Sequence, residues 1–392
     1  MTLLHTGHDR DVWYLTSQIS ELRTEVGSIL PDIAVDTATE TEFVEWKTHY
    51  PQTGAPTRQL RKTVAATLEL LNELQSTPGV KLDVTSLADK MAKLSLNLSD
   101  LGLREEAFAV QTIVVVLCRA GRDMPAIARS LTRRSVTLSR LDRREEALLM
   151  SEEAANILRT LATTQPDAFR PDLASSLSNL SNCLSSLGRR EEALQMIKEA
   201  VIIHRTLAEG RPDAFRPDLA KSLNNLSNHL SGLDRWEEAL LTIEDAVSIR
   251  RILAADRPEV FRPNLAKSLT NLSGCLSNLG RGEEALRAVE EAVKIYRPLA
   301  AEHPAVFDPD LARSLTNLSG ILSHLGRIPE ALSATEEAAK LLRLLVKEHP
   351  AIFTRKLAKS LSMLSRYYLD TGRPEDAVLA QKEAKDLDSG SA

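Results

Sequence analysis

Residues 217–262 read PDLAKSLNNLSNHLSGLDRWEEALLTIEDAVSIRRILAADRPEVFR, and versions of this 46-residue block recur along the 392-residue chain. The block opens with Pro-Asp-Leu-Ala or Pro-Asn-Leu-Ala, at Pro171, Pro217, Pro263 and Pro309. The blocks from Pro217 and Pro263 agree at 28 of 46 positions. A fixed period in the range of about 20 to 50 residues marks a unit that buries its apolar face only by stacking on copies of itself. The chain is therefore predicted to be a repeat array.

Two stretches of each block carry apolar residues at helical spacing, for example 173–187 and 193–207. A glycine separates the two stretches, where left-handed backbone closes a helix, at Gly102, Gly188, Gly280, Gly326 and Gly372. Glutamates begin the second stretch and an arginine lies near its end, as the helix dipole favours. Each block thus predicts two helices, followed by a proline that ends the second helix and a phenylalanine that fills the seam to the next block.

These residues resemble the tetratricopeptide repeat in its extended, kinesin-light-chain-like form. The spacing that carries the resemblance is Leu177, Leu180-Ser181, Leu184, Gly188, Ala193, Ile197 and Ala200. The departures are a Leu where the family usually has Trp, a Ser in the small position, and a unit about 12 residues longer than the standard 34. The resemblance implies an all-α, right-handed superhelical solenoid of helix-turn-helix repeats.

Counting by this template predicts about seven repeats over residues 85–388. Their boundaries fall at 85–124, 125–170, 171–216, 217–262, 263–308, 309–354 and 355–388, with a tail at 389–392. The last helix is more polar than its counterparts, as a solvent-facing cap requires. Residues 1–84 do not fit the period and are predicted to be helical. They are expected to cap the first repeat; the alternative is that they are the end of an upstream domain.

Composition limits the function classes. A net charge of −5 argues against a dedicated nucleic-acid binder, and no apolar run is long enough to span a bilayer. The three cysteines show no disulfide or metal spacing, and the N-terminus lacks the apolar core of a signal peptide. A cytoplasmic location is expected. The histidines form no metal set and no HExxH, Walker or GxSxG pattern occurs, so we expect no enzyme activity and no cofactor or metal.

Polar residues repeat on the face of the first helix that stacking leaves free. Asparagine is a poor helix former, so its recurrence in mid-helix needs a reason, and its amide can bind a peptide backbone of any sequence. Basic residues precede this row by four positions and would attract acidic groups. The predicted peptide-binding groove comprises Asn179, Asn182, Lys221, Asn225, Asn228, Lys267, Asn271, Arg313, Asn317 and Lys359.

The row resembles the asparagine ladder of some tetratricopeptide superhelices, and its pairing with lysine partly resembles their carboxylate clamps. Each set also has a purely structural interpretation: the asparagines bridge neighbouring helices, and the basic residues form a solvated face. The favoured hypothesis is a non-catalytic scaffold or adaptor that binds a protein or peptide ligand, and the basic row favours an acidic one. The main alternative is the regulatory or sensing arm of a larger signalling protein, of the NLR- or protease-associated kind. An RNA-binding solenoid is disfavoured by the charge, and the oligomeric state is left open.

Overall fold

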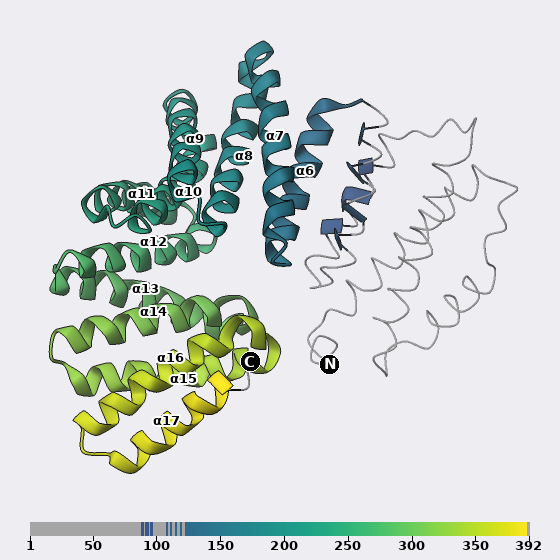
Figure 1. Ribbon diagram of the computed structural model, residues 1–392. Helices are drawn as coiled ribbons and strands as arrows, with labels where there is room; N and C mark the ends of the chain where they lie inside the picture. The colour runs from purple at the N-terminus through teal and green to yellow at the C-terminus, as the bar shows by residue number, and fades with distance from the viewer. Residues whose placement is uncertain are drawn as a thin grey trace, which may run out of the picture. The chain divides into compact units, whose positions relative to one another are not determined.

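The computed structural model describes residues 122–389 and a set of positions between 88 and 119. The predictions for residues 1–84, for Gly102 and for residues 390–392 lie outside the described residues. Regular structure in the described part of the chain is entirely α-helical (Figure 1). Contacts divide the chain into two units, residues 1–189 and 190–392, which are treated separately.

The first unit contains three described helices: α6 (Met124–Arg140), α7 (Arg144–Thr164) and α8 (Pro166–Ser186). The second unit contains α9 (Arg190–Gly210), α10 (Pro212–Ser231), α11 (Trp236–Asp256), α12 (Pro258–Asn278), α13 (Gly282–Glu302), α14 (Pro304–His324), α15 (Ile328–Glu348), α16 (Pro350–Asp370) and α17 (Pro374–Ser389). Within each unit every helix packs on the next one in the chain. The prediction of stacked helix pairs is confirmed.

The turn inside each repeat requires left-handed backbone. Gly188 has a φ of 77°, and Gly280, Gly326 and Gly372 have φ values of 74–75°, as the sequence predicted. Asp142 and Asp234 occupy the equivalent position in their repeats with φ values of 59° and 56°. A short polar side chain tolerates this conformation better than other non-glycine residues, so the turn keeps its geometry where glycine is missing.

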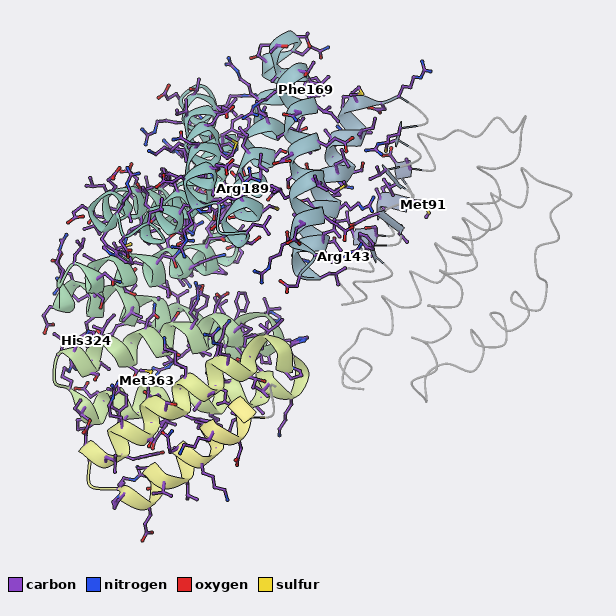
Figure 2. The ribbon with its side chains drawn as sticks, viewed as in Figure 1. Met91, Arg143, Phe169, Arg189, His324 and Met363 are labelled. Atoms are coloured by element: carbon purple, nitrogen blue, oxygen red, sulfur yellow. The ribbon has the colours of Figure 1, made fainter. Side chains whose placement is uncertain are left out.

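The connection between repeats is shorter than the sequence indicated. The first helix of the block at Pro171 begins at Pro166, so only Gln165 separates it from α7. Pro166 lies in the first turn, where its missing N–H costs nothing. Pro171 therefore lies inside α8, one turn further on. The segment expected to be a connector is the helical start of the next repeat, and it repeats at α10, α12 and α14. Figure 2 shows Arg143, in the turn before α7, and Phe169, near the start of α8, at opposite ends of the α7–α8 pair.

The core is built from small and branched aliphatic residues. The alanines that open the second helices, Ala193, Ala239, Ala285 and Ala331, are fully buried. Leucines of the first helices are buried as well, and Phe261 is buried in a cluster with Leu265, Leu269 and Tyr296. Small residues let helices approach closely, and the phenylalanine fills the space that the connection leaves.

The first helices of successive repeats lie closer together than the second helices do. In the second unit α12 contacts both α10 and α14 directly, whereas no comparable contact joins successive second helices among the described residues. Ion pairs between long side chains join successive second helices instead. Examples are Arg251 to Glu291 at 2.6 Å and Arg297 to Glu337 at 2.7 Å. This difference in spacing curves a stack toward its first helices. We call the solvent-facing side of α10, α12, α14 and α16 the inner face.

Candidate functional site

The predicted binding residues of the second unit lie on the inner face. Lys221, Asn225 and Asn228 are on α10, and Lys267 and Asn271 are on α12. Arg313 and Asn317 follow on α14, and Lys359 on α16. All are exposed or half-buried. Asn179 is half-buried and Asn182 exposed on α8 of the first unit.

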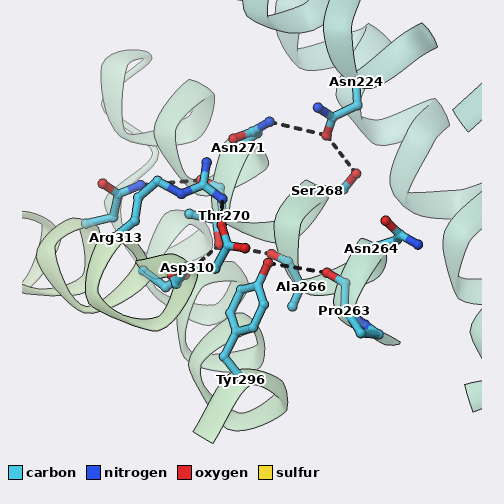
Figure 3. A network of polar contacts seen from close by, with 12 residues as sticks. Asn224, Pro263, Asn264, Ala266, Ser268, Thr270, Asn271, Tyr296, Asp310 and Arg313 are labelled. Atoms are coloured by element: carbon cyan, nitrogen blue, oxygen red, sulfur yellow. Dashed lines mark hydrogen bonds and ion pairs between the residues drawn. The ribbon is translucent and has the colours of Figure 1, made fainter. Parts of the chain in front are cut away.

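Asn271 joins two repeats (Figure 3). Its Nδ2 donates to Oδ1 of Asn228 at 3.0 Å and to Oδ1 of Asn224 at 3.2 Å, both on α10. Asn224 is 2% exposed, and its Oδ1 also accepts a 3.0 Å hydrogen bond from the Ser268 hydroxyl. This amide N–H therefore holds neighbouring first helices together, which is the structural interpretation of the asparagine row.

The remaining hydrogen-bonding capacity of the row faces solvent. Asn317 reaches across to the Thr270 carbonyl with a long 3.5 Å contact. Asn225 makes no hydrogen bond to any described residue, and Oδ1 of Asn271 accepts none from them. Acceptor oxygens and one complete amide thus stay available on the inner face, which leaves room for the ligand interpretation at Asn225 and Asn271.

The basic residues differ in their local partners. Arg313 donates from Nη2 to Oδ1 of Asp310, one turn earlier, at 2.8 Å. Within the described residues Lys221, Lys267 and Lys359 have no carboxylate within ion-pair distance. Burial, and next the charge of Arg313, lower the pKa of the Lys267 ammonium, and Arg250 and Lys221 act in the same direction while Asp310 opposes them. Positive charge therefore gathers around α12.

A buried position on each second helix faces the start of a neighbouring first helix. We call it the seam position; it is occupied by Leu158, His204, Arg250, Tyr296 and Leu342. His204 Nδ1 lies 2.8 Å from the Ser222 hydroxyl, and Arg250 Nη1 donates to the hydroxyl of the equivalent Ser268 at 2.6 Å. The repeats with leucine at the seam position leave the equivalent serines, Ser176 and Ser360, without a hydrogen-bond partner. Polar seam residues thus satisfy hydroxyls that leucine cannot.

Sequence reasoning missed Arg250, Asn264 and Asn224. Arg250 is 5% exposed, and its Nη1 also donates to the Asn264 carbonyl at 2.5 Å. The signal that could have found it was the comparison of equivalent positions, because the other seam residues carry no permanent charge. Asn264 likewise stands where Asp172, Asp218 and Asp310 stand in other repeats.

His204 should make stability depend on pH. Burial is the main cause that lowers the pKa of this imidazole from its usual 6.5, and Nε2 has no hydrogen-bond partner. Below about pH 6.5 this histidine binds a proton in the unfolded chain but stays neutral in the folded chain. The free energy of unfolding therefore falls as the pH falls from 7 to 5. Nearby Asp218 partly offsets this effect and Lys221 adds to it.

The His204→Leu variant, which copies Leu158 and Leu342, should lose part of this pH dependence. Urea unfolding at pH 7 and pH 5 measures it as a smaller difference between the two unfolding free energies than in the unmodified chain. His229, whose pKa burial also lowers, keeps the remainder. If the difference between the unfolding free energies at pH 7 and pH 5 is the same in both proteins, His204 does not cause the pH dependence.

The repeats match a family model described as the tetratricopeptide repeat, at residues 173–213, 219–259, 265–305 and 311–351. These are tetratricopeptide repeats. Arrays of this family are generally non-catalytic scaffolds that bind protein or peptide partners. The matched residues include the inner-face rows of α10, α12 and α14 in the second unit.

The solved structure of one repeat protein supports the fold, and a second is more distantly similar. The crystal structure of BtubC (BKLC) from P. vanneervenii is similar with a TM-score of 0.52 and 19% sequence identity, covering 63% of this chain and 92% of that one. A putative kinesin light chain with nearly identical TPR-like repeats from Podosopora anserina has a TM-score of 0.43 and 20% identity, covering 56% and 97%. No functionally curated protein matches the chain in sequence.

Two other kinds of site were sought in the described part of the chain. None of its helices has the length and apolar character needed to cross a bilayer. No group of three or more His, Cys, Asp or Glu side chains there is arranged to hold a metal ion. Cys183 and Cys275 are buried beside serine hydroxyls, with Cys275 Sγ 3.5 Å from Ser231 Oγ.

Proposed function

We propose that this tetratricopeptide-repeat protein is a non-catalytic adaptor that binds a peptide segment along its inner face. The observation that carries the proposal is the set of unused hydrogen-bonding groups on α10 and α12, at Asn225 and at Oδ1 of Asn271. An amide offers both a donor and an acceptor to a peptide backbone, so such groups hold an extended segment without requiring one sequence.

The positive charge of the inner face supports the proposal that the ligand is acidic. Lys221, Lys267 and Lys359 lie on the same face as the amides and have no carboxylate partner within the described residues. Exposed cations attract acidic side chains over a range of about 8 Å at physiological salt, and this speeds association. The chain as a whole carries a net charge of −5, so a basic inner face would be a local feature of the fold.

The test is selection of random displayed peptides on the purified full chain, followed by calorimetric titration of the selected peptides. The double variant Asn225→Ala/Asn271→Ala should bind them about tenfold more weakly, because each lost hydrogen bond is worth about 0.5–1.5 kcal/mol. Binding should also weaken as salt is raised.

The matched control is Asn278→Ala. Asn278 is exposed at the end of α12, and its Nδ2 donates to the Gly274 carbonyl within its own helix. This variant should bind the selected peptides as the unmodified chain does. Equal binding by the double variant and the control would reject the asparagine row as the site, and failure to select any peptide would reject the peptide-binding function.

A further inference from the structure

The seam between α11 and α12 departs from the other repeats in two ways, and both add positive charge. Its seam residue is Arg250, where other repeats have leucine, histidine or tyrosine. The second turn of α12 carries Asn264, where Asp172, Asp218 and Asp310 supply a carboxylate in three other repeats and Lys356 supplies a cation in α16. The two residues touch, because Arg250 Nη1 donates to the Asn264 carbonyl at 2.5 Å. The same place in the fold thus gains a cation and loses an anion.

Arg250 is an unusual residue to bury. Its guanidinium is 5% exposed and has no carboxylate within ion-pair distance among the described residues; its bonds go to a carbonyl and the Ser268 hydroxyl. Burial lowers its pKa to about 10, so it stays charged at neutral pH. A buried charge without a counter-charge destabilises a fold, and such features concentrate at functional sites.

The charge of Arg250 influences Lys267 on the inner face of α12. This charge, with those of Arg313 and Lys221, contributes to the lowered pKa of Lys267 after the larger effect of burial. The neighbourhood holds four cations, Lys221, Arg250, Lys267 and Arg313. The carboxylates of this neighbourhood are Asp218, which together with Lys221 acts on the pKa of His204, and Asp310, which acts on Lys267 and is engaged by Arg313 at 2.8 Å. Four positive and two negative charges leave a net charge of +2.

We propose that the first half of α12 forms an anion subsite for a doubly charged oxyanion, namely the phosphorylated side chain of a bound peptide. Lys267, Lys221 and the exposed Asn264 amide provide donors that contact the anion. Arg250 is a positioning residue that supplies charge from beneath them. A phosphorylated residue carries about −1.5 to −2 at pH 7 and matches the net charge, whereas a single carboxylate satisfies only half of it. The proposal rests on the proposed function for the peptide that carries the group.

The first experiment uses inorganic phosphate as the probe, with acetate for comparison, titrated calorimetrically into the full chain at low ionic strength. We expect saturable phosphate binding that is tighter than acetate binding. Asn264→Asp restores the carboxylate that three other repeats carry, and Arg250→Leu copies Leu158 and Leu342, so the array itself accepts both residues. Each variant should weaken phosphate binding by at least about fivefold.

The matched control is Ser248→Asp, which adds the same charge on the exposed side of α11. It should leave the phosphate affinity unchanged. No saturable binding at about 10 mM phosphate, a range that still detects millimolar affinity, would overturn the subsite. Equal affinity in the unmodified chain, the two test variants and the control would overturn it as well.

The second experiment separates the subsite from the peptide-binding function. A peptide selected on the full chain is prepared with phosphoserine, glutamate or serine at each position in turn. Phosphoserine at one position should bind tighter than glutamate, and glutamate tighter than serine, and Asn264→Asp should remove this order. Equal affinity for the phosphoserine, glutamate and serine peptides would reject the subsite and keep the adaptor function. Phosphate binding without any peptide binding would keep the subsite and reject the adaptor function.

Discussion

Replacing Leu315 by alanine is expected to lower the free energy of unfolding by about 2–5 kcal/mol, the range for large-to-small changes in a packed core. Leu315 on α14 is 0% exposed, and it packs in the cluster of Leu311, Val293 and Tyr296 that joins consecutive repeats. The cost combines lost apolar burial with a cavity that the flanking helices cannot close, since each helix is already fixed by its neighbours on both sides.

Urea unfolding followed by circular dichroism measures this loss in the full chain. The control is Leu344→Ala on α15, because Leu344 is 51% exposed. That change should cost less than about 0.5 kcal/mol, as surface substitutions usually do. Similar losses in the two variants would mean that the α13–α14 seam is not packed as described.

Replacing Arg250 by leucine is expected to raise the free energy of unfolding by about 1–3 kcal/mol. The burial that lowers its pKa to about 10 costs the charged form about 3 kcal/mol, at about 1.4 kcal/mol per pKa unit. Two hydrogen bonds are lost in return, but Ser268 keeps its bond to Asn224. Buried charges replaced by well-packed aliphatic residues often give neutral or stabilised proteins.

The control for this variant is the adjacent Arg251→Leu. Arg251 is exposed and pairs with Glu291 at 2.6 Å, so its loss should cost less than about 1 kcal/mol. Urea unfolding of both variants at pH 7 gives the comparison. If Arg250→Leu unfolds more easily than Arg251→Leu, the guanidinium is a net stabilising contact, and the argument that it is retained for binding fails.

The helix pairs, the left-handed turn and the stacking residues could be read from the sequence because they repeat. Gly188 and Leu177 recur in register, and local spacing alone predicts the helices that contain them. The start of the first helix was harder to place. Two prolines lie five residues apart, at Pro166 and Pro171. The recurring Pro-Asp-Leu-Ala motif contains the second, which suggested that the helix begins there. Only the structure shows that the helix accommodates it.

The candidate site was predicted in part. The inner-face rows were found because they repeat, but the hydrogen bonds of Asn271 to Asn224 and Asn228 depend on the distance between repeats, which spacing along the chain does not contain. Arg250 and Asn264 could not be found from recurrence, because these two residues depart from the repeated pattern. A repeat array shares its packing among all copies, so its specific chemistry is found where one copy differs.

The variety at the seam position has a consequence for assembly of the chain. Nearly identical modules can dock on the wrong neighbour, and this is the characteristic failure of repeat proteins as they fold. His204 on α9 bonds to Ser222 on α10, and Arg250 on α11 bonds to Asn264 and Ser268 on α12. A slipped docking would leave these polar groups buried without their partners, which costs more than a mismatch of leucines. The seams at His204 and Arg250 therefore favour their correct neighbours, and packing of the repeats out of register is disfavoured there.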